Sequence, residues 1–263
     1  MTTSAHAQRI AVVTGASSGI GEATARTLAG QGFHVIVAAR RADRIAALAD
    51  EIGGTAVVTD VTDPAAVADL AQRCEQVCES LSGSINVLVN NAGGAKGLAS
   101  VEQADLEHWR WMWETNVLGT LQVTRALLPK LVASGDGLVV TVTSIAAFEI
   151  YDGGAGYTSA KHAQSALHRT LRGELLGKPV RLTEIAPGMV DTEFSLVRFE
   201  GDRDRADAVY SGLTPLTAAD IAEVIGFVSS RPPHVDLDQI VIRPRDQASA
   251  TRANRRVKDS SSS

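Results

Sequence analysis

The octapeptide TGASSGIG, residues 14–21, decides how the rest of this sequence is interpreted. It follows the apolar run 10–14 and leads directly into residues with helical spacing. Gly15 permits a tight turn, Gly19 lets backbone approach a pyrophosphate, and Gly21 allows a helix to pack closely on a strand. Phosphates would then lie at the helix N-terminus, where free N–H groups favour negative charge. The spacing differs from the general dinucleotide fingerprint, so the prediction of a dinucleotide site depends on the position between strand and helix.

Short apolar runs alternate with segments of helical spacing along the chain. The strand-like runs lie at 10–14, 35–38, 56–59, 87–90, 138–142, 180–185 and 240–242, and the helix-like segments at 20–29, 41–52, 65–81, 106–131, 157–176 and 218–229. Runs that are apolar on both faces, each followed by a helix, are typical of a parallel sheet covered by helices. We therefore predict one α/β domain over residues 1–250, a Rossmann-type doubly wound parallel sheet of about seven strands with helices on both faces.

Composition argues against several other classes of protein. The 263 residues are 44% hydrophobic and 21% charged, which is typical of globular chains and not of disordered or fibrous ones. A net charge of −5 indicates neither a nucleic-acid partner nor binding to an anionic membrane. Cys74 and Cys78 have no further cysteine or histidine nearby to complete a ligand set, so we expect no metal site. The first residues carry no export signal, and we expect a cytoplasmic protein.

Two segments depart from the alternation. The stretch 192–216 turns polar, with charged residues gathered at 200–205, and it follows the sixth strand at the ligand end of the sheet. We expect it to form a lid over a small substrate, with a merely solvated loop as the alternative. Residues 251–263, rich in arginine and ending in a run of serines, are predicted to be a poorly ordered tail.

The end of the second predicted strand indicates which dinucleotide binds. NAD-selective sites carry an acidic residue about 20 residues beyond the glycine turn. Here residues 38–41 read Ala-Ala-Arg-Arg, and no carboxylate occurs before Asp43. The guanidinium groups of Arg40 and Arg41 suit the 2′-phosphate of NADP, although both arginines could instead be the solvated start of a helix. We expect NADP(H) as the cofactor.

A second group of residues is suited to proton transfer. Ser144 follows the fifth predicted strand, and Tyr157 and Lys161 lie four residues apart at the start of the next helix, on one face. A phenol with an ordinary pKa near 10 is a poor base at neutral pH, but a neighbouring ammonium lowers that pKa. Ser144 would then hydrogen-bond the substrate oxygen while Tyr157 exchanges its proton.

Taken together, these motifs resemble the single-domain short-chain dehydrogenases/reductases. The similar elements, in chain order, are TGASSGIG at 14–21, Asp60, NNAG at 90–93, Asn116, Ser144, Tyr157 with Lys161, and PGMVDT at 187–192. The resemblance implies that Tyr157 is the general acid/base and that Ser144 orients the substrate carbonyl. It also implies that Lys161 holds the nicotinamide ribose and lowers the tyrosine pKa, and that Asn116 supports a proton-relay water. With the glycine turn and the arginine pair, the implied cofactor site comprises Gly15, Ser17, Ser18, Gly19, Ile20, Gly21, Arg40, Arg41, Asp60, Val61, Asn91, Ala92, Gly93, Tyr157, Lys161, Pro187, Gly188, Val190 and Thr192.

The C-terminal third is similar to a narrower group. Residues 191–210 and 213–244 look like the NADP-dependent 3-hydroxy acid (serine / L-allo-threonine) dehydrogenases. The resemblance implies oxidation of the β-carbon hydroxyl of a small acid, or the reverse reduction, and commonly a homotetramer, with a homodimer as the alternative. Arg198 is the first candidate for a cation that binds the substrate carboxylate, and Lys96 is the second. Alternatively, Arg198 pairs with Glu200 or with a neighbouring subunit.

We therefore expect an NADP(H)-dependent oxidoreductase that transfers a hydride between the nicotinamide and a secondary alcohol or carbonyl. The substrate would be a small 3-hydroxy acid or a related small aldehyde or ketone. One alternative is a reductase of carrier-bound 3-oxoacyl thioesters. Another is an NADP(H)-sensing protein without turnover, against which the intact Ser144, Tyr157 and Lys161 argue.

Overall fold

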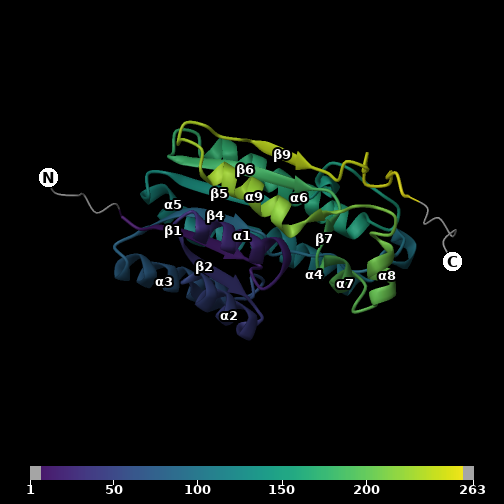
Figure 1. Ribbon diagram of the computed structural model, residues 1–263, viewed down its shortest axis with the longest axis horizontal. Coiled ribbons are helices and arrows are strands. Elements are labelled where there is room, and N and C mark those ends of the chain that lie inside the picture. The colour runs from purple at the N-terminus through teal and green to yellow at the C-terminus, as the bar shows by residue number, and fades with distance from the viewer. Residues whose placement is uncertain (1–6, 257–263) are drawn as a thin grey trace, which may run out of the picture.

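A computed structural model describes residues 7–256 and has one parallel sheet at its centre (Figure 1). The sheet has seven strands in the order β3-β2-β1-β4-β5-β6-β9. They are β1 (Arg9–Thr14), β2 (His34–Ala39), β3 (Thr55–Val58), β4 (Ser84–Asn90), β5 (Gly137–Val142), β6 (Val180–Pro187) and β9 (Gln239–Ile242). A second, two-stranded sheet joins β7 (Val190–Asp191) to β8 (Leu216–Thr217). The predicted single-domain, doubly wound α/β fold is confirmed.

Helices cover both faces of the sheet because the strands are apolar on both sides. Along β1, Ala11 and Val13 point into one core, and Ile10 and Val12 point into the other. The first core is closed by α1 (Gly19–Gly30), α2 (Ala42–Ile52) and α9 (Ala218–Ser229), and the second by α3 (Pro64–Ser80), α5 (Gly119–Ala133) and residues of α6 (Ala155–Glu174). Figure 1 shows α1 and α9 side by side in front of the sheet.

The strand order reverses between β1 and β4. The chain winds from β1 outward to β3 in one direction and from β4 outward to β9 in the other. Crossover connections therefore leave the carboxyl ends of β1 and β4 uncovered, where α/β folds bind their ligands. The Asn91 side chain, just after β4, joins these two ends because its Nδ2 donates to the Thr14 backbone oxygen at 2.9 Å.

The helix predicted over 106–131 contains a π-helical turn. It consists of α4 (Leu106–Trp113), the π segment η2 (Glu114–Leu118) and then α5. The Asn116 side chain donates from Nδ2 to the Met112 oxygen at 2.7 Å, the acceptor that a regular helix offers to the backbone N–H at position 116. The helix widens at this residue, as is frequent at functional sites.

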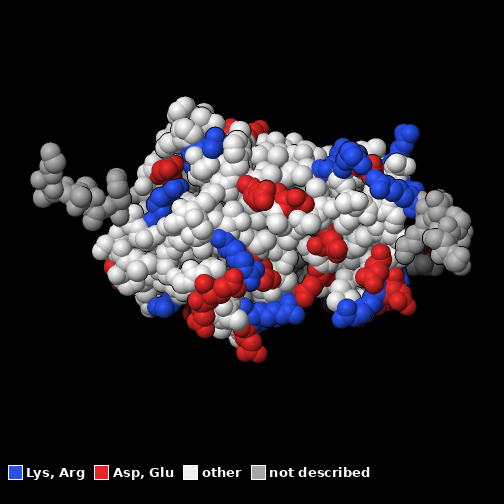
Figure 2. Space-filling view, viewed as in Figure 1, with Lys and Arg blue, Asp and Glu red and all other residues white. Residues whose placement is uncertain are grey.

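The segment 192–216 is more ordered than a loop. It contains the short helices α7 (Phe194–Arg198) and α8 (Arg203–Ala208), which Figure 1 shows at the carboxyl-end edge of the sheet. The 3-10 turns η1 (Val101–Gln103) and η3 (Ile145–Ala147) complete the elements. No helix within 7–256 is sufficiently long and apolar to cross a bilayer. Figure 2 shows acidic and basic side chains interspersed over the visible face.

The last described residues make hydrogen bonds to other parts of the chain. Asn254 donates its backbone N–H to the Asp246 oxygen, and Arg256 donates its own to the Gly212 oxygen, each at 2.8 Å. The Arg255 guanidinium donates to the Val209 and Ser211 oxygens. Arg255 and Arg256 therefore bind the segment 192–216 through its backbone. Residues 257–263 lie outside the described part of the chain.

Candidate active site

A cavity of about 770 Å³, here called the large cavity, opens at the carboxyl edge of the sheet. The sequence-predicted residues that line it are Gly15, Ser17, Ser18, Gly19, Ile20, Arg40, Arg41, Asp60, Val61, Asn91, Ala92, Gly93, Ser144, Tyr157, Lys161, Pro187, Gly188, Val190, Thr192 and Arg198. Three predicted residues, Gly21, Asn116 and Lys96, do not line it. The fold thus gathers residues from positions 15 to 198 around one space large enough for an extended ligand.

The glycine turn adopts the backbone that its sequence predicted. Gly15 and Gly19 have φ of +65° and +56°, which side chains rarely tolerate. A Cβ on Gly21 would lie 2.5 Å from both the Gly15 oxygen and Asn91 Nδ2. Gly21 is therefore a packing glycine that brings α1 close to the turn and does not itself contact the cavity.

We expect Gly21→Ala to lower the free energy of unfolding by about 1–3 kcal/mol, because backbone and the fixed Asn91 amide cannot both move aside. Gly30→Ala is the matched control in the same helix, since no atom lies within 4 Å of a Cβ there. That control should be neutral or slightly stabilising. Urea unfolding of both variants checks this, and equal stabilities would contradict the packing role.

Arg41 reaches the glycine turn. Its Nε donates to Ser17 Oγ at 2.9 Å and its Nη2 to Ser18 Oγ at 2.6 Å. Arg40 is more exposed and lies 4.0 Å from the Asp60 carboxylate. Arg41 thus holds a fixed guanidinium beside two hydroxyls at the helix N-terminus, which is a donor set suited to a phosphate.

Glu193 is a feature of this site that the sequence did not reveal. Its carboxylate accepts from Arg41 Nη1 at 2.7 Å and from Arg44 Nη1 at 2.8 Å. These hydrogen bonds lower the pKa of Glu193 to about 2, so it is ionised at any ordinary pH. A separation of 152 residues from Arg41 left no spacing signal in the sequence. Glu193 would compete with a phosphate for Arg41.

Ser144, Tyr157 and Lys161 all line the large cavity. Tyr157 and Lys161 share one face of α6, and the Lys161 Nζ lies 5.8 Å from the centre of the Tyr157 ring. Both side chains are buried. The Ser144 Oγ accepts from the Ala146 N–H at 3.1 Å, which fixes it at the start of η3. The Phe194 ring of α7 packs edge-on against Tyr157, with ring centres 5.5 Å apart.

Burial dominates the electrostatics of this group. It raises the pKa of Tyr157 well above its ordinary value, and nearby Tyr151 adds to the rise, while the Ser144 hydrogen bond and the Arg198 charge oppose it. Burial lowers the pKa of Lys161 to about 7, opposed by the charge of Glu184. Among the protein's own groups, the lowered phenol pKa expected from the sequence is therefore not found, because desolvation of phenolate outweighs the neighbouring charges.

Asn116 lies behind the cavity wall and not on it. Its Oδ1 accepts from the Gly94 N–H at 3.2 Å, and its Nδ2 donates to the Gly94 oxygen at 2.9 Å. A Cβ on Gly93 would lie 2.5 Å from the Asn116 Oδ1 and 3.5 Å from the Lys161 Nζ. The π-helical turn thus places Asn116 where it fixes the backbone next to the lysine.

Of the two candidate cations for a substrate carboxylate, only Arg198 faces the large cavity. Its Nε donates to the Gly97 oxygen at 3.1 Å and its Nη2 to the Tyr151 hydroxyl at 3.0 Å. Its Cζ lies 5.8 Å from the centre of the Tyr157 ring. Within the described chain it makes no ion pair with Glu200, the alternative that the sequence left open.

Lys96, the second candidate, does not line the large cavity. Its Nζ lies 5.2 Å from the centre of the Trp111 ring, and the residue borders a separate cavity of about 30 Å³. The ammonium is held by its attraction to the aromatic face of Trp111, and Trp111 itself lines the large cavity. Lys96 neighbours the cavity wall in sequence, but it is not among the residues that line the large cavity.

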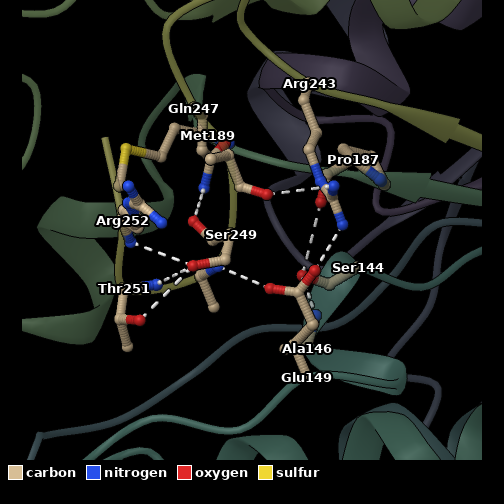
Figure 3. Close-up of polar contacts among 12 residues, drawn as sticks. Ser144, Ala146, Glu149, Pro187, Met189, Arg243, Gln247, Ser249, Thr251 and Arg252 are labelled. Carbon is tan, nitrogen blue, oxygen red and sulfur yellow. Dashed lines mark hydrogen bonds and ion pairs between the residues drawn. The ribbon is translucent and has the colours of Figure 1, made fainter. Parts of the chain in front are cut away.

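The C-terminal segment adds an unpredicted wall to the large cavity, formed by Gln247, Ala250 and Thr251. The Gln247 Oε1 accepts from the Met189 N–H at 2.8 Å, and the Glu149 carboxylate accepts from the Arg243 guanidinium and the Ala250 N–H (Figure 3). These contacts tie residues 243–250 to the loop after Ser144 and to the loop after β6. No sequence motif indicated them.

Comparison with known proteins decides the family. The family model described as short chain dehydrogenase matches residues 9–202. The chain belongs to the short-chain dehydrogenase/reductase family. It is therefore an oxidoreductase of this family, whose members use a nicotinamide cofactor.

Relatives of this short-chain dehydrogenase cover nearly its full length. An uncharacterized oxidoreductase of Mycobacterium tuberculosis (strain ATCC 25618 / H37Rv) is 77% identical over 96% of this chain and 97% of that protein. Serine 3-dehydrogenase of Agrobacterium fabrum is 40% identical over 91% of this chain and 95% of that protein. A solved structure, the closed form of serine dehydrogenase complexed with NADP+, superposes with a TM-score of 0.85 at 36% identity, covering 94% of this chain and all of that one.

Proposed function

We propose that this short-chain dehydrogenase is an NADP(H)-dependent enzyme that interconverts a secondary alcohol and a carbonyl. Its substrate is a small 3-hydroxy acid or a related small aldehyde or ketone. One observation carries the proposal: the buried Tyr157 and Lys161, the half-buried Ser144 and the Arg198 side chain line the same cavity as the glycine turn and Arg41. The relatives named serine dehydrogenases support the substrate class.

The residues at the glycine turn fit NADP(H). Gly19 has a φ of +56°, which favours glycine, and a Cβ there would crowd Thr192 Cγ2 at 3.1 Å, so glycine suits a turn that holds a pyrophosphate. Arg41, with Ser17 and Ser18, would hold the 2′-phosphate, and Arg40 would flank it. Asp60, Val61 and the backbone at 91–93 would border the adenosine, and residues 187–192 the nicotinamide. When bound, the nicotinamide supplies or accepts the hydride.

Tyr157 would move the proton. In the reducing direction its hydroxyl protonates the oxygen formed from the substrate carbonyl, and Ser144 donates a hydrogen bond to the same oxygen. The raised pKa of Tyr157 keeps it protonated for this step. In the oxidising direction the phenol must lose its proton, which requires the positive charge of Lys161 beside it. Water near Lys161 and Asn116 would return the proton to solvent.

Arg198 would bind the substrate's acid group. Its two present partners, the Gly97 oxygen and the Tyr151 hydroxyl, are neutral, so its charge is not cancelled by a described carboxylate. Because the Arg198 Cζ lies 5.8 Å from the centre of the Tyr157 ring, a small acid whose carboxylate binds Arg198 would have its β-carbon near Tyr157. This short reach favours a small free acid over a carrier-bound thioester.

We expect Arg198→Met to raise KM about 10- to 100-fold for acid substrates, the size of one charge-assisted hydrogen-bonded pair. The KM for neutral carbonyl substrates should rise much less. Because Arg198 contacts Tyr157, we expect some loss of activity with both acid and neutral substrates. Lys96→Met is the matched control, since Lys96 is outside the large cavity. Equal changes for acid and neutral substrates would remove Arg198 from this role.

A substrate panel assayed in parallel with NADPH and NADH tests the proposal. It contains serine, L-allo-threonine, 3-hydroxypropionate, small neutral carbonyls and an acetoacetyl thioester. We expect turnover of a small acid with preference for NADP(H). Preference for the thioester would favour the carrier-bound alternative, and NADPH binding without turnover of any compound would favour a sensor.

Assembly and location are part of the same proposal. From the family resemblance we expect a cytoplasmic homotetramer. Light scattering coupled to gel filtration measures the assembly, and a monomeric mass would contradict it.

A further inference from the structure

A chain of hydrogen bonds runs through the protein interior from Lys161 to Asn116. The Lys161 Nζ donates to Gln164 Oε1 at 2.8 Å, the Gln164 Nε2 donates to Thr120 Oγ1 at 2.8 Å, and the Thr120 hydroxyl donates to the Asn116 backbone oxygen at 2.8 Å. All four residues are buried, and Gln164 and Asn116 are fully so. Neither Gln164 nor Thr120 belongs to the motifs that identified the site.

The hydrogen bonds of the Lys161 ammonium to the protein leave its third N–H free to point in one direction. An ammonium carries three N–H donors. One goes to Gln164 Oε1 and a second to the Val142 oxygen at 3.2 Å. Because Lys161 lines the large cavity, the third can point into it. Gln164 thus selects the orientation that makes the lysine available to a ligand.

Two helices are joined by this chain. Lys161 and Gln164 lie three apart on α6 and so share a face, while Thr120 lies on α5 directly after the π-helical turn that holds Asn116. The Gln164–Thr120 bond is therefore a cross-link between the helix that carries the lysine and the turn that fixes the neighbouring cavity wall. All three hydrogen bonds run in the same direction: each residue donates to the next one on the way from Lys161 to Asn116.

We propose that Gln164 and Thr120 are positioning residues for the reaction. Together they hold the Lys161 ammonium at a fixed position relative to the π-helical turn at Asn116, and therefore relative to Tyr157. The proposal deepens the proposed function and rests on it, since the lysine acts beside Tyr157. Neither residue touches the cavity, so both act through Lys161. Losing either link leaves a buried donor or acceptor without its partner.

The charged and titratable groups around Lys161 determine how the pH test is interpreted. On α6, Tyr157 lies beside it, and burial lowers the pKa of His168 to about 4, which leaves that residue neutral in assays. On β6, the buried Glu184 raises the pKa of Lys161. On α7, Arg198 lies against the Tyr157 ring. None of these groups is altered by the variants below.

Two variants of Gln164 give opposite expectations. Gln164→Leu removes an acceptor from the ammonium, so the pKa of Lys161 falls further; Gln164→Glu adds a negative charge, so it rises. In the reducing direction, with Tyr157 protonated, activity is lost as Lys161 loses its proton. The alkaline limb of the kcat/KM–pH profile should therefore move down by about half a pH unit or more in the first variant and up in the second.

Thr120 provides the matched pair. Thr120→Val keeps the shape of the side chain but removes the hydroxyl, and we expect kcat to fall about tenfold with the NADPH dissociation constant changed less than about twofold. Thr120→Ser should recover most of that loss. Thr183→Val is the control, because the buried Thr183 hydroxyl has no partner among the described residues. Unfolding curves accompany every variant.

The outcomes separate this proposal from the proposed function. Opposite shifts for Gln164→Leu and Gln164→Glu, with rescue by Thr120→Ser, support the chain. Folded variants with an unmoved alkaline limb and unchanged kcat would overturn it. If the wild-type protein turns over nothing, the proposed function fails, and nitrogen NMR titration of Lys161 then tests the chain alone. In that titration, an unchanged Lys161 pKa in both Gln164→Leu and Gln164→Glu would also overturn the proposed role of Gln164 and Thr120.

Discussion

Tyr157→Phe should bind NADPH with nearly unchanged affinity and turn over its substrate about 10²- to 10⁴-fold more slowly. The ring keeps its packing against Phe194, so the cavity retains its shape. Only the hydroxyl that exchanges the proton is lost. NADPH fluorescence titration and steady-state rates measure the two quantities separately.

Tyr151→Phe is the control for Tyr157→Phe, since it removes a phenol from the same cavity. That hydroxyl accepts from Arg198 and has no proton to transfer in the proposed mechanism. We expect Tyr151→Phe to lose much less activity than Tyr157→Phe, and we expect the loss to be a higher KM for acid substrates. Comparable kcat losses in both variants would show that Tyr157 is not the proton donor.

The second large effect concerns the choice between NADPH and NADH. Arg41→Leu should lower kcat/KM for NADPH about 10- to 100-fold and leave that for NADH nearly unchanged, because only the 2′-phosphate needs the guanidinium. Its hydrogen bonds to Ser17 and Ser18 fix it at the phosphate end of the site. Rates with both cofactors over a concentration series measure the ratio.

Glu193→Gln should act in the opposite direction to Arg41→Leu. The ionised Glu193 carboxylate occupies Arg41 Nη1, and its neutral amide analogue would leave that donor available to a phosphate. We expect tighter NADPH binding in this variant. An unchanged NADPH to NADH ratio in both variants would mean that Arg41 does not recognise the 2′-phosphate.

Local signals allowed much of this site to be predicted from the sequence. The glycine turn specifies its own backbone, and a spacing of four places Tyr157 and Lys161 on one helix face whatever surrounds them. The strands were identifiable because a fully buried parallel sheet is apolar throughout. These features are determined by residues that are close together in the sequence. They can therefore be predicted from a single sequence.

Features that depend on distant contacts could not be predicted in this way. Glu193 meets Arg41, and Gln247 meets the backbone of Met189, across connections without any periodic pattern. Whether Lys96 lines the cavity could not be predicted either, because a position beside the cavity wall in the sequence does not determine the direction of a side chain. The phenol pKa was misjudged because burial, which dominates it, is a property of the folded chain.

Deuterium transfer tests hydride transfer at this site most directly. The wild-type enzyme is incubated with NADPH deuterated at the transferable C4 position and with a small 3-oxo acid or aldehyde, and the product is analysed by mass spectrometry. We expect one deuterium on the former carbonyl carbon of each product molecule, and almost no product from Tyr157→Phe. Product without deuterium, or deuterated product formed equally fast by Tyr157→Phe, would contradict the proposed mechanism.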